Sequence, residues 1–481
     1  MSSLNTGNNG ADQAITESTA IIETRGGSTY YANLRRLSRF SVVVDVHGAE
    51  PVLRASEALE NLKIVSDDRT IYSGPSVVRN MVAYAASITC ELMLEESGWF
   101  DLKVDRNFFE PHSLRQQFQD FVKQWQKLYK ILPEFKIAVA DLQSFLLDLR
   151  HWLDQVELNI RSQPAGCDES ERKALKGLAE PVLQNLGVVF ERFEYVTQQL
   201  DPNLRSAHSL YAQRQLHPLV LCAPFMYRTF RKPLGYAGDY EMVNMMARDP
   251  FQGASVFAKV LNTFFLNTPP VVAHRNRIDY LYSVLVREID RVSRSGGVAR
   301  VLNLGCGPAL EIQAFLEKSP PNLKADFTLL DFNDETVAHT TGVLNSLKNK
   351  FGRSSEIRIL KKSVAQFLKE QSKPVSSLGG KPFDLVYCAG LFDYLADPIC
   401  ERLLSAFYNL TAPGGVVVST NVDLANPSRG WMEYMVDWYL CYRDSKGMGK
   451  LMPQVPAENL RVFSDESGVN VMMEARRTQH G

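Results

Sequence analysis

The segment Ala299-Arg-Val-Leu-Asn-Leu-Gly-Cys-Gly-Pro-Ala-Leu310 decides the fold. Its apolar run, 301–304, predicts a buried strand, and a glycine turn and a helix follow. Gly305 can adopt the backbone conformation of a tight turn, and Gly307 lets a ligand approach the main chain without meeting a Cβ atom. The helix would direct its free N–H groups at that ligand. The segment therefore predicts a nucleotide-binding turn.

Leu310 indicates which nucleotide the turn fits. A dinucleotide site would carry Gly or Ala at this position, for pyrophosphate contact and close packing of the helix. With Leu310 the turn suits a nucleoside carried without a pyrophosphate. A nicotinamide-dependent oxidoreductase is disfavoured for the same reason.

A carboxylate ends the next apolar run, Phe327-Thr-Leu-Leu, at Asp331. One carboxylate can hold both hydroxyls of a ribose, and α/β nucleotide sites place an acid at the tip of the second strand. Asn333 and Asp334 precede a helical stretch, so this turn can also supply a helix N-cap. Both roles fit within one turn.

The rest of the C-terminal half alternates strands with helices. Further strands are predicted at 357–360, 383–394 and 415–421. This alternation predicts a parallel, doubly wound α/β sheet with ligands at the carboxyl ends of the strands. Residues 460–463 and 469–475, separated by a turn, predict a terminal antiparallel hairpin.

The glycine turn, Asp331 and the hairpin together resemble the class I S-adenosylmethionine (SAM) methyltransferases. The resemblance implies a Rossmann-like sheet and SAM as the cofactor. A terminal hairpin after five parallel strands is unlike a dehydrogenase.

Composition narrows the class of protein. A chain of 481 residues has room for two or three domains. Its 53 Lys and Arg nearly balance 54 Asp and Glu, so it lacks the basic charge on which nucleic-acid binders rely. Its 7 cysteines form no Cys-x-x-Cys pair, which argues against structural zinc and disulfides. We therefore expect no metal site. Because the N-terminus is polar and no apolar run is long, we also expect no membrane span and a cytoplasmic location.

The N-terminal part has two predicted regions. Residues 1–28, rich in Ser, Thr, Asn and Gly, predict a disordered tail, and residues 29–107 predict a small antiparallel β-barrel. The barrel's β-rich runs, separated by Gly, Pro and Asp turns, are 40–46, 60–65, 70–72, 77–82 and 87–94.

Arg35 and Arg39 form an Arg-x-x-x-Arg arm in front of these runs. Planar guanidinium groups suit phosphates and guanine edges. The arm and the barrel resemble the PilZ domain, which implies binding of cyclic di-GMP. The second element of that family, Asp/Asn-x-Ser-x-x-Gly, has no match at 66–69 or 72–74. We therefore expect weak or absent binding, and a basic, solvated strand entry is the alternative.

Residues 108–215 predict a helical linker or bundle. Apolar residues recur at steps of three and four over 118–132, 142–156 and 175–200, which places them on one face of each helix. Stripes this rich in aromatic residues have to be covered, so we expect a homodimer through this region.

The segment 231–244, Arg-Lys-Pro-Leu-Gly-Tyr-Ala-Gly-Asp-Tyr-Glu-Met-Val-Asn, has two glycines close together, which indicates a required backbone path. This loop, His274-Arg-Asn-Arg at a helix start, and Cys388-Ala-Gly-Leu-Phe-Asp-Tyr394 resemble a bacterial methyltransferase family assigned to the biosynthesis of 3-hydroxypalmitic acid methyl ester, an extracellular signalling factor. The resemblance covers 216–481 and implies a methyltransferase domain whose N-terminal part, 216–290, is a lid.

SAM has a sulfonium, an α-amino group and a carboxylate. Arg275 or Arg277 is expected to pair with the carboxylate, with a surface salt bridge as the alternative. Asp239 is expected to take the amino group, because many methyltransferases carry an acid where this chain has Asn303. Tyr236 or Tyr240 would lie over the sulfonium or adenine. The other expected cofactor contacts are Gly305, Cys306, Gly307, Asp331, Asn333, Ser363, Val364, Ala389 and Gly390.

The acceptor decides whether a base is needed. A carboxylate acceptor is already ionised near pH 7, so orientation and exclusion of water suffice. An amine or hydroxyl acceptor needs a general base, for which Asp393 and Tyr394 are the candidate catalytic residues. An aromatic group could shape an acyl pocket, although helix packing explains it equally well: Phe392, Trp431, Tyr434, Trp438 and Tyr439.

These patterns predict a bacterial SAM-dependent methyltransferase that esterifies the carboxylate of a hydroxy fatty acid or a similar small acid. The alternative is a second-messenger-responsive regulatory protein whose methyltransferase domain binds SAM but acts mainly as an interaction module.

Overall fold

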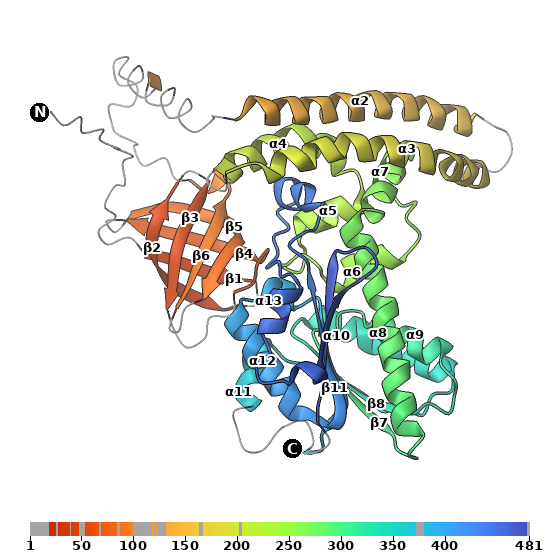
Figure 1. The fold of residues 1–481 in the computed structure, drawn as a ribbon. Coiled ribbons are helices and arrows are strands. Elements are labelled where there is room, and N and C mark those ends of the chain that lie inside the picture. Colours follow the sequence, from red (N-terminus) through yellow and green to blue (C-terminus); the bar gives the residue numbers. More distant parts are fainter. Residues whose placement is uncertain are drawn as a thin grey trace, which may run out of the picture. The chain divides into compact units, whose positions relative to one another are not determined.

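The computed structural model describes residues 19–25, 27–38, 40–47, 53–66, 69–83, 87–99, 131–162, 167–201, 204–371 and 380–478, and the single positions 115, 118, 119 and 122. The chain divides into two compact units (Figure 1). One consists of Met1–Pro51 with Ala58–Lys123, and the other of Val52–Glu57 with Gln124–Gly481.

The first unit contains a closed antiparallel barrel with the strand order β1-β2-β3-β6-β5-β4. Its interior is built from alternate residues, such as Val42 and Val44, which are fully buried. The turn η1 (Glu96–Gly98) follows the last strand. The strands are β1 (Thr19–Thr24), β2 (Thr29–Leu37), β3 (Ser41–His47), β4 (Ala58–Ser66), β5 (Arg69–Ala83) and β6 (Ser87–Leu94).

Strand β1 lies within the segment 1–28 that composition assigned to a disordered tail, so that prediction is wrong for 19–24. Ala20 and Ile22 point into the barrel and are fully buried. The strand pairs with both β2 and β4 and thereby closes the barrel. Closure leaves no open sheet edge, which is why a short and weakly apolar segment is ordered here.

The predicted arginine arm begins on β2 itself. Arg35 forms an ion pair with Asp45 of β3, and Arg39 lies outside the described residues. Binding of cyclic di-GMP by this arm stays a prediction.

The predicted helical region contains α2 (Pro133–Arg161), α3 (Cys167–Gln198) and α4 (Arg205–Val220). The buried stripe of α2 includes Phe135, whose ring lies 5.8 Å from that of Phe193 in α3 and 4.8 Å from that of His208 in α4. Neighbouring helices therefore cover much of this stripe, although Trp152 and Leu158 are exposed. The expected homodimer stays a prediction, and most of the stripe at 118–132 lies outside the described residues.

The predicted boundary between 215 and 216 falls inside α4, so the helical region and the following part are not separate there. The hydroxyl of Ser209 donates to the carbonyl of Tyr434 at 3.1 Å, and Nε2 of His217 lies 2.6 Å from the carbonyl oxygen of Met435. Both carbonyls belong to the π-helical turn η4 (Trp431–Met435). These bonds make α4 part of the second unit.

The sheet of the second unit has the order β12-β13-β11-β10-β7-β8-β9. The five strands β11, β10, β7, β8 and β9 pair in parallel, and β13 of the terminal hairpin pairs antiparallel to β11. This arrangement confirms the predicted Rossmann-like α/β fold. The strands are β7 (Ala299–Leu304), β8 (Ala325–Asp331), β9 (Ile357–Lys361), β10 (Phe383–Ala389), β11 (Thr411–Val422), β12 (Leu460–Ser464) and β13 (Asn470–Arg476).

Helices cover both faces of this sheet (Figure 1). One apolar cluster joins a face of the sheet to α8 (Pro269–Ser293), α9 (Leu310–Lys318) and α10 (Asp334–Lys350). The other cluster joins the opposite face to α11 (Val364–Gln371), α12 (Asp397–Leu410) and α13 (Ser445–Lys450). The remaining elements are α5 (Pro224–Arg231), α6 (Tyr240–Ala247), α7 (Val256–Leu266), η3 (Phe392–Tyr394) and η5 (Ala457–Asn459).

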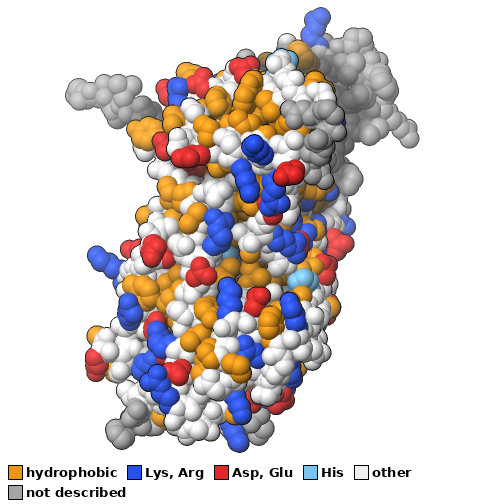
Figure 2. Space-filling model, turned by 90° about the vertical axis from the view of Figure 1, so that its right-hand side faces the viewer, with side chains coloured by type: hydrophobic (Ala, Val, Ile, Leu, Met, Phe, Trp, Pro, Cys, Tyr) orange, Lys and Arg blue, Asp and Glu red, His pale blue; other side chains and the backbone are white. Residues whose placement is uncertain are grey.

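Acidic and basic side chains are interspersed over the face shown in Figure 2, as expected from a net charge of −1. Among the described helices, none is both long enough and apolar enough to cross a membrane.

A buried carboxylate ties α8 to the hairpin. Glu288 accepts hydrogen bonds from Arg476 of β13 at 2.6 Å and from Arg291 at 2.8 Å, and its side chain is 2% exposed. Burial raises the pKa of Glu288, but the hydrogen bonds from Arg476 and Arg291 outweigh that effect, so the pKa lies below its usual value of 4.5. The ionised form is therefore the one that stabilises the fold.

We expect Glu288→Gln to lower the free energy of unfolding by about 3 kcal/mol at pH 7, because it leaves the guanidinium of Arg476 without its counter-ion. The folded pKa is depressed, so this stabilisation is present above about pH 4.5 and is lost as the pH falls further. Denaturant titrations at pH 7 and pH 4 measure both effects. Asp290→Asn, which alters the exposed pair with Arg294, is the control and should cost less than about 1 kcal/mol. An equal loss in both variants at pH 7 would contradict the prediction.

Candidate functional site

The turn after β7 has the geometry that its glycines predict. Gly305 and Gly307 have φ angles of 73° and 51°, in the left-handed region. The N–H groups of Gly305 and Cys306 donate to the carbonyl of Leu330 at 2.8 and 3.1 Å, which ties the end of β7 to β8. A Cβ atom on Gly307 would meet no atom within 4 Å, and this residue lines a pocket at the carboxyl end of the sheet.

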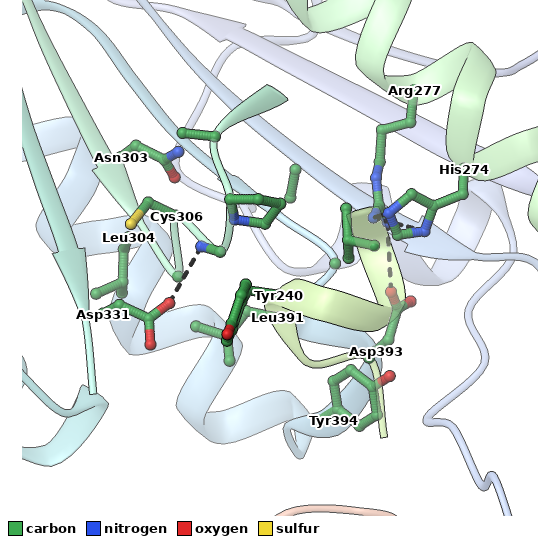
Figure 3. Close-up of a pocket in the computed structure, with 18 of the residues that line it drawn as sticks. Tyr240, His274, Arg277, Asn303, Leu304, Cys306, Asp331, Leu391, Asp393 and Tyr394 are labelled. Atoms are coloured by element: carbon green, nitrogen blue, oxygen red, sulfur yellow. Dashed lines mark hydrogen bonds and ion pairs between the residues drawn. The ribbon is translucent and has the colours of Figure 1, made fainter. Parts of the chain in front are cut away.

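Asp331 lies at the tip of β8, facing this turn (Figure 3). Its carboxylate accepts the N–H of Gly307 at 3.1 Å and that of Asn333 at 3.1 Å. Burial raises its pKa, and these two hydrogen bonds oppose the rise. The carboxylate is thus held in one orientation at the edge of the pocket.

One pocket brings most of the predicted residues together. Both candidate catalytic residues, Asp393 and Tyr394, line it. The predicted cofactor residues in its wall are Tyr236, Arg277, Gly305, Cys306, Gly307, Asp331, Val364, Ala389 and Gly390. Their contact with a cofactor stays a prediction.

Three predicted cofactor residues are not among those that line the pocket: Asp239, Asn333 and Ser363. Each caps a helix. Asp239 accepts the N–H of Met242 at 2.8 Å, Asn333 that of Thr336 at 3.0 Å, and Ser363 that of Gln366 at 3.2 Å. Side-chain oxygens of these types satisfy the free N–H groups of a first helical turn.

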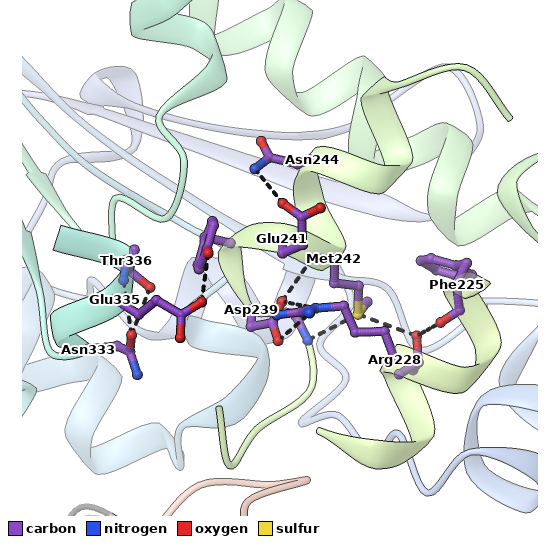
Figure 4. A network of polar contacts seen from close by, with 12 residues as sticks. Phe225, Arg228, Asp239, Glu241, Met242, Asn244, Asn333, Glu335 and Thr336 are labelled. Atoms are coloured by element: carbon purple, nitrogen blue, oxygen red, sulfur yellow. Dashed lines mark hydrogen bonds and ion pairs between the residues drawn. The ribbon is translucent and has the colours of Figure 1, made fainter. Parts of the chain in front are cut away.

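Asp239 has a further partner that explains its place in the loop (Figure 4). Nε of Arg228, on α5, lies 2.9 and 3.1 Å from its two carboxylate oxygens. The side chain of Asp239 is 3% exposed, and this pair joins α5 to the start of α6. The carboxylate therefore has structural partners, and its contact with an amino group stays a prediction.

The rest of the predicted lid loop does reach the pocket. Gly235 and Gly238 have φ angles of 88° and 77°, so the loop needs glycine at both positions. A Cβ atom on Gly238 would lie 2.5 Å from the hydroxyl of Tyr394. The ring of Tyr236 lies 5.1 Å from that of Phe332, next to Asp331.

Of the two candidate arginines on α8, Arg277 lines the pocket. It is 6% exposed, and its Nη1 lies 3.9 Å from Oδ2 of Asp393 (Figure 3). Its Nη2 lies 2.8 Å from Nε2 of His274, whose pKa is held well below its usual value by burial and by the charge of Arg277. Arg275 points elsewhere and donates to the carbonyl of Leu266 at 2.7 Å.

The two candidate catalytic residues have different proton affinities. Burial raises the pKa of Asp393 to about 6, although the charge of Arg277 opposes it, and the N–H of Val422 donates to Oδ1 at 2.6 Å. Burial also raises the pKa of Tyr394, whose hydroxyl accepts the indole N–H of Trp438 at 3.0 Å. Asp393 can therefore change its charge near neutral pH, whereas Tyr394 stays a neutral phenol.

The expected aromatic group divides in two. Trp438 lines the pocket, whereas the other four are not among the described residues that line it. Three of those four, Phe392, Trp431 and Tyr434, are at most 3% exposed.

Glu311, Tyr387 and Arg54 also line the pocket, although the sequence pattern predicts no role for them. The hydroxyl of Tyr387 donates to Oε1 of Glu311 at 2.6 Å, and burial raises the pKa of that carboxyl group. Oδ1 of the neighbouring Asn303 is buried without a hydrogen-bond partner in the described part of the chain. Glu311 was detectable as an acid in the first turn after the glycines, but Arg54 has no local signal.

No group of three or more His, Cys, Asp and Glu in the described residues is arranged to hold a metal ion.

Gly390 lies so close to the guanidinium of Arg277 that there is no room for a side chain between them. Its φ angle is 84°, and a Cβ atom there would lie 2.9 Å from Nη2 of Arg277. We expect Gly390→Ala to lower stability by about 1–3 kcal/mol more than Gly352→Ala, because only the former displaces a buried side chain. Gly352 is the matched control, since its φ angle is 61° and the space around it is open. Denaturant unfolding of both variants measures the difference, and equal losses would mean that backbone strain alone accounts for the effect.

Three solved structures illustrate what the fold is similar to. A possible exported protein from Bordetella parapertussis has 16% identity and a TM-score of 0.38, covering 64% of this chain and 97% of its own. Magnesium protoporphyrin IX methyltransferase from Synechocystis PCC 6803, with bound SAM, has 12% identity and a TM-score of 0.30, covering 44% and 82%. The N-methyltransferase NodS from Bradyrhizobium japonicum, with S-adenosyl-L-homocysteine, has 16% identity and a TM-score of 0.29, covering 52% and 98%.

A search of curated proteins finds no significant match. A family model described as a methyltransferase domain matches residues 274–473. The matched segment begins in α8, includes the glycine turn and Asp331, and ends in β13. This part of the chain is therefore a methyltransferase domain.

Proposed function

We propose that the protein is a SAM-dependent methyltransferase whose acceptor is the carboxylate of a hydroxy fatty acid or a similar small acid. The observation that carries the proposal is one pocket in which the glycine turn faces the oriented carboxylate of Asp331. The family match over 274–473 supports the reaction class.

The groups in the pocket fit the parts of SAM. The carboxylate of Asp331 suits the ribose hydroxyls, and the open space at Gly307 accommodates a nucleoside against the main chain. The unpartnered Oδ1 of Asn303 is a buried acceptor that suits an α-amino group. The guanidinium of Arg277 suits the carboxylate of the methionine arm.

The lining of the pocket includes several apolar side chains, which favour an acceptor with a hydrocarbon part. They include Val422, Met432, Trp438 and Leu440. A wall of this kind excludes water and orients the acceptor. When bound, SAM supplies an electrophilic methyl group on its sulfonium.

A carboxylate acceptor is ionised at neutral pH and needs no proton removed. In that reaction the role of Asp393 is to hold Arg277, 3.9 Å away, through its negative charge. A hydroxyl or amine acceptor would instead require Asp393 as a general base.

The direct test is incubation of the purified protein with methyl-labelled SAM and a bacterial lipid extract, followed by mass spectrometry. We expect label in alkali-labile methyl esters. Label in an alkali-stable ether or amine would replace the carboxylate with another acceptor. SAM binding without label in any product would favour a regulatory protein that uses the domain as an interaction module.

Asp331→Asn tests the cofactor site. The amide keeps the shape of the side chain but removes the charge, and we expect SAM to bind about 10-fold to 100-fold more weakly, as for a lost charge-assisted hydrogen bond. Calorimetry measures the dissociation constant. Asp326→Asn, in the same strand but with a carboxylate that accepts the N–H of Glu356, is the control. Wild-type affinity in Asp331→Asn would contradict the assignment.

The pH dependence separates the two roles of Asp393. With a carboxylate acceptor, we expect kcat at saturating SAM to change by less than about threefold between pH 5.5 and 8, since no base is needed. If Asp393 were the base, protonation below its pKa of about 6 would lower the rate as the pH falls through that value. A log-linear decline with unit slope below pH 6 would therefore contradict the carboxylate proposal.

A further inference from the structure

A short segment from the N-terminal part of the chain belongs to the second compact unit. Residues 53–57 stand in sequence between β3 and β4, yet Val52–Glu57 groups with Gln124–Gly481. Leu53 and Ser56 are fully buried, and Arg54 is 9% exposed. The segment is therefore an internal part of the unit that contains the pocket.

Hydrogen bonds hold this segment in place. The N–H of Ala55 donates to the carbonyl of Tyr394 at 3.2 Å. The hydroxyl of Ser56 donates to the carbonyl of Tyr439 at 2.8 Å and accepts the N–H of the same residue. Ser56 has a φ angle of 61°, a left-handed conformation that disfavours non-glycine residues. A conformation of this kind persists where surrounding contacts over-determine it.

The anchored segment directs Arg54 into the pocket. Its guanidinium carbon lies 3.7 Å from the centre of the Phe332 ring, and it lines the same pocket as Gly307 and Asp331. Its positive charge opposes the rise in the pKa of Asp331 that burial causes. Arg54 is thus placed at the end of the pocket where Asp331 would hold a ribose.

Among the described residues, none lies within hydrogen-bond or ion-pair distance of the guanidinium of Arg54, which stacks on the ring of Phe332, while the charges of Asp331 and Glu57 act on it from farther away. Its N–H donors, in the lining of the pocket, are therefore available to a ligand. A ligand that presents a π-system and hydrogen-bond acceptors would suit them, because a guanidinium stacks on planar rings and donates in its own plane.

We propose that Arg54 is a cofactor-binding residue, which contacts the adenosine part of SAM and completes the site from outside the methyltransferase domain. The proposal rests on the proposed function. It assigns a binding role to Arg54, which lies in the N-terminal part of the chain, far before the matched segment 274–473.

The experiment compares the full-length wild type with Arg54→Ala by calorimetry, using S-adenosyl-L-homocysteine and, separately, adenosine. Adenosine lacks the methionine carboxylate, so it distinguishes contact with the nucleoside from contact with that carboxylate. We expect both ligands to bind about tenfold more weakly to Arg54→Ala, which equals about 1.4 kcal/mol. Arg294→Ala removes an arginine whose side chain is 79% exposed, and it should bind both ligands as the wild type does.

Unchanged affinity for both ligands would overturn the proposal, and tighter binding would do so by showing that Arg54 obstructs the site. A loss confined to S-adenosyl-L-homocysteine would move the contact to the carboxylate and overturn the adenosine assignment. Failure of the wild type to bind S-adenosyl-L-homocysteine would refute the proposed function itself.

If Arg54→Ala does not fold, Arg54→Lys provides a second test of ligand binding. It keeps the charge and the aliphatic stem but cannot stack as a planar group. We expect its Tm to equal that of the wild type and its affinity for adenosine to be several-fold weaker. Wild-type adenosine affinity in a folded Arg54→Lys would overturn the stacking role.

Discussion

The site depends on the backbone turn that follows β7. Gly305 and Gly307 adopt left-handed conformations, and the N–H of Gly305 is bonded to the carbonyl of Leu330 at 2.8 Å. This bond aligns the carboxyl ends of β7 and β8, and the N–H of Gly307 then orients the carboxylate of Asp331. A side chain at either glycine would require a backbone conformation that L-residues rarely adopt. The remaining pocket residues are arranged around this hydrogen-bonded turn.

Burial of charge is the second constraint. Arg277 and Asp393 are 6% and 3% exposed, and neither has an ideal ion pair, since their closest atoms lie 3.9 Å apart. Burial raises the pKa of Asp393 to about 6, and glycine at position 390 leaves room for the guanidinium. Such an arrangement keeps hydrogen-bonding capacity available for a ligand.

Several side chains that resemble ligand contacts in the sequence have structural partners. Asp239, Asn333 and Ser363 cap α6, α10 and α11. In an α/β sheet the loop after a strand is also the start of a helix, so polar residues there serve either role. The two roles have the same local pattern, and only the direction of the side chain separates them.

The sequence alone determined the sheet, the glycine turn and the position of Asp331, because apolar periodicity and conformational demands on glycine act over a few neighbouring residues. It also indicated that the loop around Gly238 needs a special backbone path. The tertiary structure decided that Arg277 rather than Arg275 faces the pocket, that β1 closes the barrel, and that Arg54 enters the site. These outcomes depend on which distant segments pack together. The local sequence pattern cannot predict them, because the burial and the hydrogen bonds involved form between residues far apart in the chain.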